Sequence, residues 1–387
     1  MYNIKKMNKI SSVIYDYLPK ERFNVSSHHE DCDAMIVRSA NLHSAEFPHN
    51  LLAVARAGAG TNNIPVDMLT EKGIVVFNTP GANANGVKEL VLGAMIASSR
   101  NLFDAYEWTR TLVGKDGEIP SLVEQGKSQF IGGELKGKML GVIGLGAIGI
   151  MVANAATAIG MKVIGYDPFL SVERAWSIST KTHRAEKLEQ LLANADYITI
   201  HIPETEKTHN FLSSHEFSKM KPGVTLLNFA RGGLVKTTSL LDAIDAGTVK
   251  KYVTDFPDEK LLGKKNVISI PHLGASTPES EENCAVMAAK QLRDFLDTGS
   301  ITNSINMPEC IVPASDTARL TIIHLNTPNM VGQITNTIAR HHINIEDMVN
   351  KSRKNIAYTV MNLDREVPKE VITELMEIDG TIKIRTI

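Results

Sequence analysis

Cysteines are scarce in this 387-residue sequence, and neither sign of charge is in excess. The three cysteines, Cys32, Cys284 and Cys310, are far apart and form no CxxC pair. This excludes a small disulfide scaffold and predicts free thiols in a reducing compartment, and we expect no metal site. The 41 basic and 43 acidic residues leave a formal net charge of −2. That balance argues against a general nucleic-acid or anionic-membrane binder.

Uninterrupted apolar segments are also scarce. The first seven residues, MYNIKKM, are followed by no apolar run, so we expect no signal peptide. The 23 residues from Met139 to Met161 contain no charged residue, but five glycines interrupt them. That pattern favours a strand, a tight turn and a helix over a lipid-facing helix. We therefore expect a cytoplasmic protein.

The chain is long enough for two or three domains, at about 150 residues each. Short apolar runs at 34–37, 51–55 and 74–77 predict strands, and 87–98 has helical spacing. Residues 113–138 are polar and glycine-rich, and we expect a connection there. From Met139 strand and helix signals alternate, which predicts a parallel sheet with helices on both faces. The strands of that sheet are expected at 140–143, 162–166, 197–202, 224–228, 252–254 and 267–270.

The C-terminal part begins with a predicted long helix over 279–296 and a turn-rich linker over 300–316. The last seventy residues then predict a strand, a helix, two strands, a helix and a strand. This β-α-β-β-α-β order is that of the ferredoxin-like unit.

A dinucleotide site is predicted at Gly144, Gly146 and Gly149, which follow an apolar strand and open a helix. The first glycine permits the tight turn, the second lets the backbone approach a pyrophosphate, and the third allows close helix–strand packing. The next strand ends at Asp167, where a carboxylate accepts hydrogen bonds from ribose hydroxyls. Its charge would repel a 2′-phosphate, so we expect NAD rather than NADP.

Four further blocks resemble the D-2-hydroxyacid dehydrogenase family. They are NTPGAN at 78–83, GELKGK at 133–138, NFARGG at 228–233 and PHLGAST at 271–277. The resemblance implies a Rossmann-type cofactor domain inserted into a flavodoxin-like substrate domain, with the active site in the cleft. The domains implied are 1–98 for the first part of the substrate domain, 99–278 for NAD binding, 279–308 for the return helix and linker, and 317–387 for a regulatory module.

The resemblance also implies catalytic roles. Arg231 would hold the substrate carboxylate, because a guanidinium grips a planar carboxylate with two hydrogen bonds. His272 would take the hydroxyl proton, since an imidazole titrates near neutrality. Glu259 matches the acid that orients this base, although FPDEK at 256–260 departs from the family pattern, which leaves Asp258 as an alternative.

Other contacts follow from the same family match. Cofactor-binding positions are Gly144, Gly146, Ala147, Ile148, Gly149, Asp167, Phe229, Ala230, Arg231, Asp255, His272, Gly274 and Ala275, with Asp255 at the nicotinamide carboxamide. Substrate-binding positions are Arg38, Gly58, Ala59 and Arg231, where Arg38 resembles the arginine near a substrate phosphate.

Residues 317–387 resemble an ACT domain, a small-molecule sensor attached to amino-acid biosynthetic enzymes. His324, Asn326 and Asn344 match the serine-binding positions of serine-regulated relatives. The combination implies NAD-dependent oxidation of 3-phosphoglycerate, the first step of serine biosynthesis, by a homodimer or homotetramer inhibited by serine. The alternatives are a reductase of hydroxypyruvate or glyoxylate, and an NAD-sensing protein that resembles transcriptional corepressors.

Overall fold

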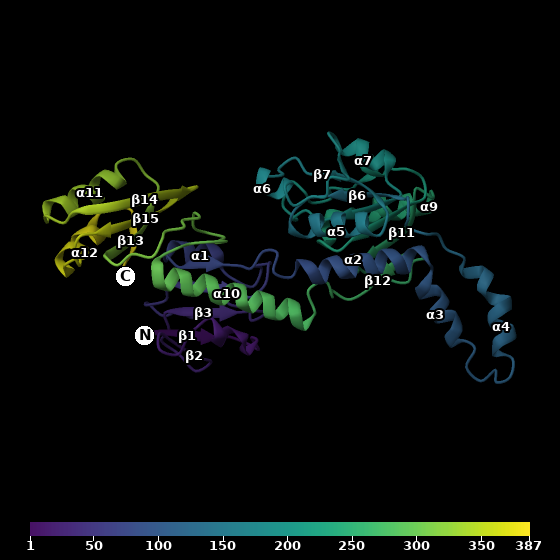
Figure 1. Cartoon of the computed structure of the whole chain (residues 1–387), viewed down its shortest axis with the longest axis horizontal. Helices are drawn as coiled ribbons and strands as arrows, with labels where there is room; N and C mark the ends of the chain where they lie inside the picture. The colour runs from purple at the N-terminus through teal and green to yellow at the C-terminus, as the bar shows by residue number, and fades with distance from the viewer. The chain divides into compact units, whose positions relative to one another are not determined.

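The computed structural model describes residues 1–387, which form two compact units. The first unit comprises Met1–Asn83 and Pro278–Ile387, and the second comprises Ala84–Thr277. Figure 1 follows the chain out of the purple N-terminal strands, through the teal strands, and back at the green helix α10 (Pro278–Thr298). The second unit is therefore inserted into the first.

None of the helices combines the length and the apolar character that a membrane-spanning segment requires.

A parallel five-stranded sheet forms the N-terminal part of the first unit. Its strands are β1 (Tyr2–Lys6), β2 (Phe23–Ser26), β3 (Ala34–Val37), β4 (Ala53–Arg56) and β5 (Val75–Phe77), and they lie in the order β2-β1-β3-β4-β5. Both faces are covered: Leu292 and Phe295 of α10 pack on one, and Leu69 of α1 (Val66–Glu71) packs on the other. This explains why β3 and β5 are apolar throughout. The strand order is that of flavodoxin-like sheets, which the family resemblance implied.

A parallel seven-stranded sheet forms the second unit. Its strands are β6 (Met139–Ile143), β7 (Lys162–Tyr166), β8 (Thr182–Arg184), β9 (Tyr197–Ile200), β10 (Val224–Asn228), β11 (Val249–Thr254) and β12 (Val267–Ser269). They lie in the order β12-β11-β10-β9-β6-β7-β8. This is the Rossmann order with one added edge strand, and the chain reverses its direction of winding between β6 and β9.

Helices cover both faces of this second sheet. The helices of this unit are α2 (Ala84–Ser99), α3 (Leu102–Arg110), α4 (Ile119–Gly126), α5 (Ala147–Ala158), α6 (Val172–Ala175), α7 (Leu188–Asn194), α8 (Ser214–Phe217) and α9 (Thr237–Asp245). The apolar side chains of α2 and α5 fill the core on one face, and those of α7, α8 and α9 fill the core on the other. Short 3-10 helices lie at Ser12–Asp16, Lys127–Phe130 and Gly232–Leu234.

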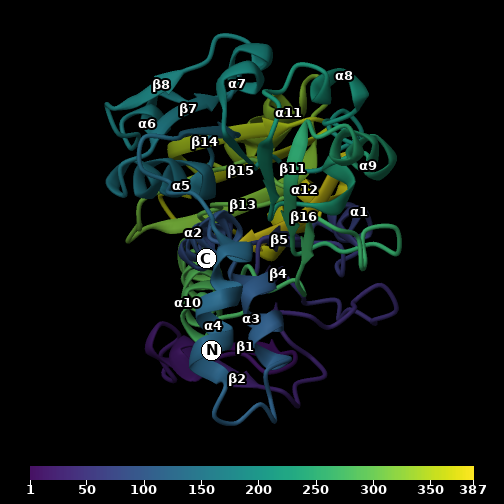
Figure 2. The same ribbon diagram turned by 90° about the vertical axis from the view of Figure 1, so that its right-hand side faces the viewer.

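The C-terminal module of the first unit is a four-stranded antiparallel sheet. It comprises β13 (Ala318–Leu325), α11 (Met330–Arg340), β14 (Ile345–Arg353), β15 (Ile356–Leu363), α12 (Lys369–Glu377) and β16 (Thr381–Thr386). Figure 2 shows β14, β15 and β13 side by side, and the full order is β14-β15-β13-β16. The predicted β-α-β-β-α-β unit is confirmed. Its helices cover one face, while Ile323 and Tyr358 on the other face join the core beneath α10.

The first domain boundary differs from the expected one at residue 98. The structure divides after Asn83, because Val91 and Met95 of α2 pack into the core of the second unit. The second boundary, expected after residue 278, lies after Thr277.

The segment 113–138 is not a plain connection. It contains the helix α4, and Trp108 at the end of α3 packs against Gly126 and against the ring of Phe130 at a centroid distance of 5.4 Å. The contact joins residues about twenty positions apart, so the local pattern alone does not reveal it.

Candidate active site

The glycine loop between β6 and α5 is shaped by two close contacts. Gly144 has φ +89°, and a Cβ there would lie 2.7 Å from the carbonyl oxygen of His201. A Cβ on Gly149 would lie 1.9 Å from the carbonyl oxygen of Gly144. Both positions therefore exclude any side chain, as the predicted turn and packing roles require.

The middle glycine faces open space instead. A Cβ on Gly146 would meet no atom closer than 4.0 Å, where the Nη1 of Arg174 lies. Gly146 is also the N-cap of α5, and no side chain caps that helix. The free N–H groups and the open backbone together fit a pyrophosphate.

Asp167 follows β7 and is held against the glycine loop. Its Oδ2 accepts a hydrogen bond from the N–H of Leu145 at 2.9 Å, and its Oδ1 accepts one from the N–H of Phe169 at 2.9 Å. Each carboxylate oxygen retains a lone pair for a further donor. The carboxylate is thus oriented at the strand end where the sequence predicts a ribose contact.

Asp255 follows β11 and carries an orphaned acceptor. The residue is 1% exposed; its Oδ2 accepts the N–H of Gly274 at 3.3 Å, while its Oδ1 is buried without a partner. Burial raises the pKa of this carboxyl, and the nearby His272 opposes the rise. A buried acceptor without a donor costs free energy, so this atom suits the amide donor of a nicotinamide carboxamide.

His272 lies beyond β12 and is exposed. Its ring packs against that of Phe256 at a centroid distance of 4.6 Å. Neither predicted carboxylate forms a hydrogen bond to it. Asp258 is committed elsewhere, because its Oδ2 accepts from the Thr237 hydroxyl at 2.6 Å and its Oδ1 accepts from the N–H of Lys260 and of Leu261.

Glu259, unlike Asp258, has no partner that holds its carboxylate in place. Its side chain is exposed and forms no hydrogen bond or ion pair in the structure. Of the two alternatives that the sequence left open, only Glu259 has both oxygens available.

Arg231 lies in a turn that Asn228 organises at the end of β10. The Nδ2 of Asn228 donates to the Arg231 carbonyl at 2.9 Å, and its Oδ1 accepts from the N–H of Ala230 at 3.2 Å. The Arg231 guanidinium is exposed, and its Nη1 donates to the Ala230 carbonyl at 2.6 Å. Four of its five N–H donors remain for an anion.

His201 is a site residue that the sequence analysis missed. It follows β9, and its N–H donates to the Ile143 carbonyl at 2.7 Å, so it borders the glycine loop. Its Nε2 is 2.9 Å from the Thr199 hydroxyl, and its Nδ1 is buried without a partner. Burial lowers its pKa to about 3, so the ring stays neutral. The sequence signal that could have identified it is its position directly after an apolar strand and two residues before Pro203. That strand, β9, lies next to β6, where the sheet reverses its direction of winding.

The predicted substrate residues of the first unit form a cluster of their own. Arg38 follows β3, and its Nη1 contacts the Oε1 of Glu281 at 2.6 Å. Arg56 ends β4, and its Nε donates to the Arg38 carbonyl at 3.1 Å. The Arg56 guanidinium also borders Gly58, where a Cβ would lie 2.7 Å from Nη1. The sequence analysis assigned no role to Arg56 or Glu281.

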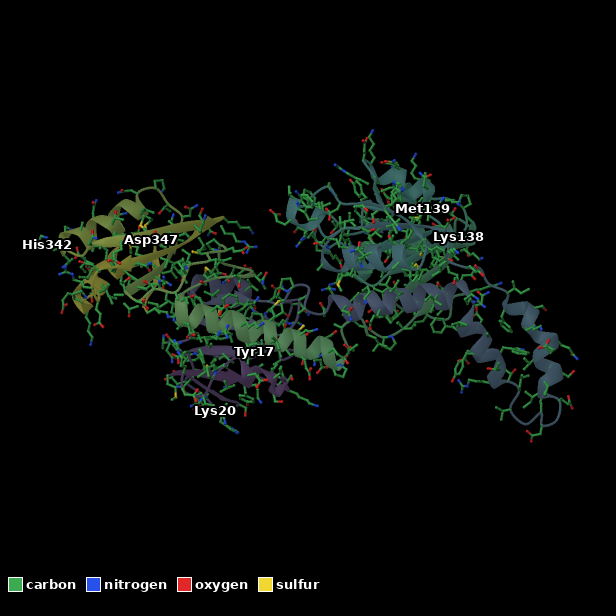
Figure 3. The ribbon with its side chains drawn as sticks, in the orientation of Figure 1. Tyr17, Lys20, Lys138, Met139, His342 and Asp347 are labelled. Atoms are coloured by element: carbon green, nitrogen blue, oxygen red, sulfur yellow. The ribbon has the colours of Figure 1, made fainter.

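The three predicted effector residues of the C-terminal module differ in burial. His324 is 1% exposed, and its Nδ1 and Nε2 lie 2.8 Å from the Leu325 carbonyl and 2.9 Å from the Thr359 hydroxyl. Both ring nitrogens therefore have protein partners, and its role as an effector ligand stays a prediction. Asn326 and Asn344 are exposed. Figure 3 shows His342, two residues before Asn344, at the rim of the module.

Residues 92–274 match the NAD-binding domain of the D-isomer specific 2-hydroxyacid dehydrogenases. The match spans Gly144, Asp167, Arg231, Asp255 and His272.

Sequence relatives point the same way. The chain is 36% identical over 289 residues to D-3-phosphoglycerate dehydrogenase of Archaeoglobus fulgidus, covering 71% of this chain and 52% of that protein. It is 37% identical over 286 residues to the human D-3-phosphoglycerate dehydrogenase, covering 72% and 51%. The chain thus spans about half the length of these curated relatives.

A solved structure also resembles this chain. The NAD+-bound 3-phosphoglycerate dehydrogenase of Entamoeba histolytica superposes with a TM-score of 0.61 and 27% identity, covering 79% of this chain and 98% of that one. The D-mandelate dehydrogenase of Rhodotorula graminis, at 22% identity and a TM-score of 0.68, shares the fold.

Proposed function

We propose that this chain catalyses the NAD-dependent oxidation of 3-phosphoglycerate to 3-phosphohydroxypyruvate. One observation carries the proposal: five predicted site groups follow five parallel strands of the Rossmann sheet and so share its carboxyl edge. These groups are the glycine loop after β6, Asp167 after β7, Arg231 after β10, Asp255 after β11 and His272 after β12. In such sheets, ligands bind at this edge. The relatives named D-3-phosphoglycerate dehydrogenase support the choice of substrate.

The cofactor fits the residues that are present. The open backbone at Gly146 would receive the pyrophosphate, Asp167 the ribose, and the orphaned oxygen of Asp255 the carboxamide. Bound NAD would supply the hydride acceptor.

Arg231 and His272 would perform the remaining chemistry. The Arg231 guanidinium would bind the substrate carboxylate and polarise the oxygen on C2. The His272 imidazole would remove the hydroxyl proton while the hydride leaves C2, and Glu259 would stabilise the resulting imidazolium. Because Asp258 is committed to its loop, Glu259 is the carboxylate we assign to this partnership.

For the remaining substrate contacts, we propose that Arg38 binds the phosphate and that the N–H group of Ala59 binds the carboxylate. The N–H of Gly58, the other predicted position, already donates to the Arg56 carbonyl at 2.9 Å. The positions of Arg38 and Arg56 support the proposal, because Arg38 follows and Arg56 ends neighbouring strands, and the Arg56 Nε donates to the Arg38 carbonyl. Two arginines suit a dianionic phosphate.

The C-terminal module would act as an ACT-type sensor that binds serine through Asn326 and Asn344. The β-α-β-β-α-β topology supports this proposal. The Nδ2 of Asn326 donates to the Lys354 carbonyl, which leaves its Oδ1 for an ammonium group. Inhibition requires serine to bind one conformation of the enzyme more tightly than another.

We also propose that the chain forms a homo-oligomer through the segment 102–131. This segment exposes large apolar side chains: Leu102, Phe103, Tyr106, Val113, Ile119 and Ile131. A second copy of the chain would cover them. The three cysteines are buried and unpaired, which supports a reducing compartment such as the cytoplasm.

The test is to follow NADH formation from NAD and 3-phosphoglycerate, with the product trapped, with and without serine. We expect turnover that serine suppresses. Turnover that is indifferent to serine would keep the enzyme and reject the sensor. Activity confined to unphosphorylated 2-hydroxy acids would replace the substrate, and tight NAD binding without any turnover would favour a cofactor-sensing protein.

A further inference from the structure

The first turn of α10 presents a carboxylate to the arginine that we assign to the substrate phosphate. Glu281 Oε1 lies 2.6 Å from Arg38 Nη1, and the two side chains are 41% and 33% exposed. Both groups are therefore within reach of solvent and of a ligand. No step of the proposed reaction uses Glu281.

The surroundings of this ion pair are positively charged. Val37, directly before Arg38, pairs in register with Arg56 on the neighbouring strand, and the Arg56 Nε donates to the Arg38 carbonyl. Cys284 lies one helical turn after Glu281, and burial raises the pKa of its thiol. The positive charges of Arg38 and Arg56 oppose this rise, and the negative charge of Glu281 adds to it. Two cations and one anion thus act on the same small region.

From this arrangement we propose that Glu281 is a specificity-determining residue, which competes with the substrate phosphate for Arg38. The inference rests on the proposed function, since it takes Arg38 as the phosphate-binding group. The Glu281 carboxylate keeps the Arg38 guanidinium oriented when no substrate is bound. A phosphate must displace this carboxylate or share the N–H donors of the guanidinium with it. The carboxylate then offsets part of the positive charge that Arg38 offers to the incoming dianion.

The physical consequence depends on the substrate. A phosphorylated acid places a second anion beside Glu281, so the repulsion acts on its binding. An unphosphorylated acid such as D-glycerate places a neutral hydroxyl there and does not meet this repulsion. Glu281 therefore lowers the preference for phosphorylated acids without affecting the chemical step.

The experiment compares Glu281→Gln with the wild-type protein. The amide keeps the size of the side chain and removes its charge. We expect KM for 3-phosphoglycerate to fall about tenfold, the effect of one unit charge close to a partly exposed phosphate, with kcat unchanged. KM for D-glycerate should change less than about twofold. The matched control is Glu282→Gln, which removes the same charge from the neighbouring, exposed position of α10.

A double variant separates competition from general electrostatics. In an Arg38→Ala background, Glu281→Gln should no longer distinguish the two acids, because the shared partner is gone. A higher KM for 3-phosphoglycerate in Glu281→Gln would overturn the proposal and make Glu281 a positioning residue for Arg38. Equal changes for both acids, or the same change in Glu282→Gln, would also overturn it.

Calorimetric binding of 3-phosphoglycerate to the NADH-loaded protein provides a readout without turnover. If the wild type binds this acid but oxidises only unphosphorylated acids, the proposed function fails while the tighter binding to Glu281→Gln still supports competition. If binding to Glu281→Gln is no tighter than to the wild type, the competition fails whatever the activity shows.

Discussion

The cofactor edge of the second unit and the predicted effector site of the C-terminal module were assigned by the same kind of motif, and they differ in what their polar atoms do. At the cofactor edge, Asp255 Oδ1 and His201 Nδ1 are buried without partners, and the backbone at Gly146 is open. In the C-terminal module, both ring nitrogens of His324 already have protein partners. Orphaned atoms and open backbone indicate a place prepared for a ligand, while a satisfied ring indicates a structural role.

The largest effect is expected at the cofactor edge of the second unit. His272→Ala should lower kcat roughly 10²- to 10⁴-fold, because the proposed general base is lost, while NAD affinity is largely kept. Steady-state kinetics and NAD titration measure the two quantities. A kcat near the wild-type value would remove His272 from the mechanism and weaken the contrast between the two sites.

A pair of glycine variants separates packing from ligand binding at the loop. Gly149→Ala should destabilise the protein by about 3 kcal/mol or more, since its Cβ would lie 1.9 Å from a carbonyl oxygen. Gly146→Ala should keep the Tm within a few degrees and weaken NAD binding about tenfold or more, because its Cβ enters the space meant for the pyrophosphate. Unfolding by denaturant and NAD titration check both. Unaltered NAD affinity in Gly146→Ala would mean that the pyrophosphate does not approach there.

Asp255→Asn tests the orphaned carboxylate through stability and pH. Burial raises the pKa of Asp255 in the folded state above its ordinary value of 3.8. Its ionised form therefore destabilises the apo protein increasingly as the pH rises from 3.8 through the folded pKa. The variant should therefore have a higher Tm than the wild type at pH 7, and the difference should shrink as the pH falls towards 4. NAD binding should weaken about tenfold, because an amide is the poorer acceptor. A lower Tm at pH 7 would show that the carboxylate stabilises the fold.

The smallest expected effect tests the other side of the comparison. His324→Ala should destabilise the chain by about 1–3 kcal/mol, because it removes the ring that bonds the Leu325 carbonyl and one of the two partners of the Thr359 hydroxyl. The exposed Asn326→Ala is the control and should change stability by less than about 0.5 kcal/mol. If His324→Ala instead abolishes a serine response without changing the Tm, His324 is an effector ligand after all.

Much of the fold was predictable because its strands are apolar on both faces. The ranges expected at 162–166 and 224–228 agree with β7 and β10 residue for residue. The strands that were missed, β1, β2 and β8, lie at or next to sheet edges. In β1 only Ile4 is fully buried, so YNIKK has no apolar run to recognise. Position in the sheet, which the local sequence does not encode, decides how apolar a strand must be.

Site positions that act through the backbone were predictable from the sequence. Positions whose role depends on side-chain partners were less predictable. Gly144 and Gly149 follow from steric requirements that any such turn imposes. The commitments of Asp258 to Thr237 and of His324 to Thr359 join residues 21 and 35 positions apart. Such pairings depend on the folded arrangement, and no spacing rule distinguishes a carboxylate or imidazole already engaged from one that is free.

The insertion of the second unit has a consequence for the growing chain. The five-stranded sheet is complete at Phe77, but its cover, the apolar face of α10, begins only at Pro278. At roughly 5–20 residues per second, the ribosome needs about 10–40 s to synthesise the intervening segment. During that interval Ile36, Ala55 and Phe77 face solvent or a chaperone. The second unit contains all the helices that cover its own sheet, so it is able to fold first. The N-terminal part of the first unit completes its core only after α10 has been synthesised.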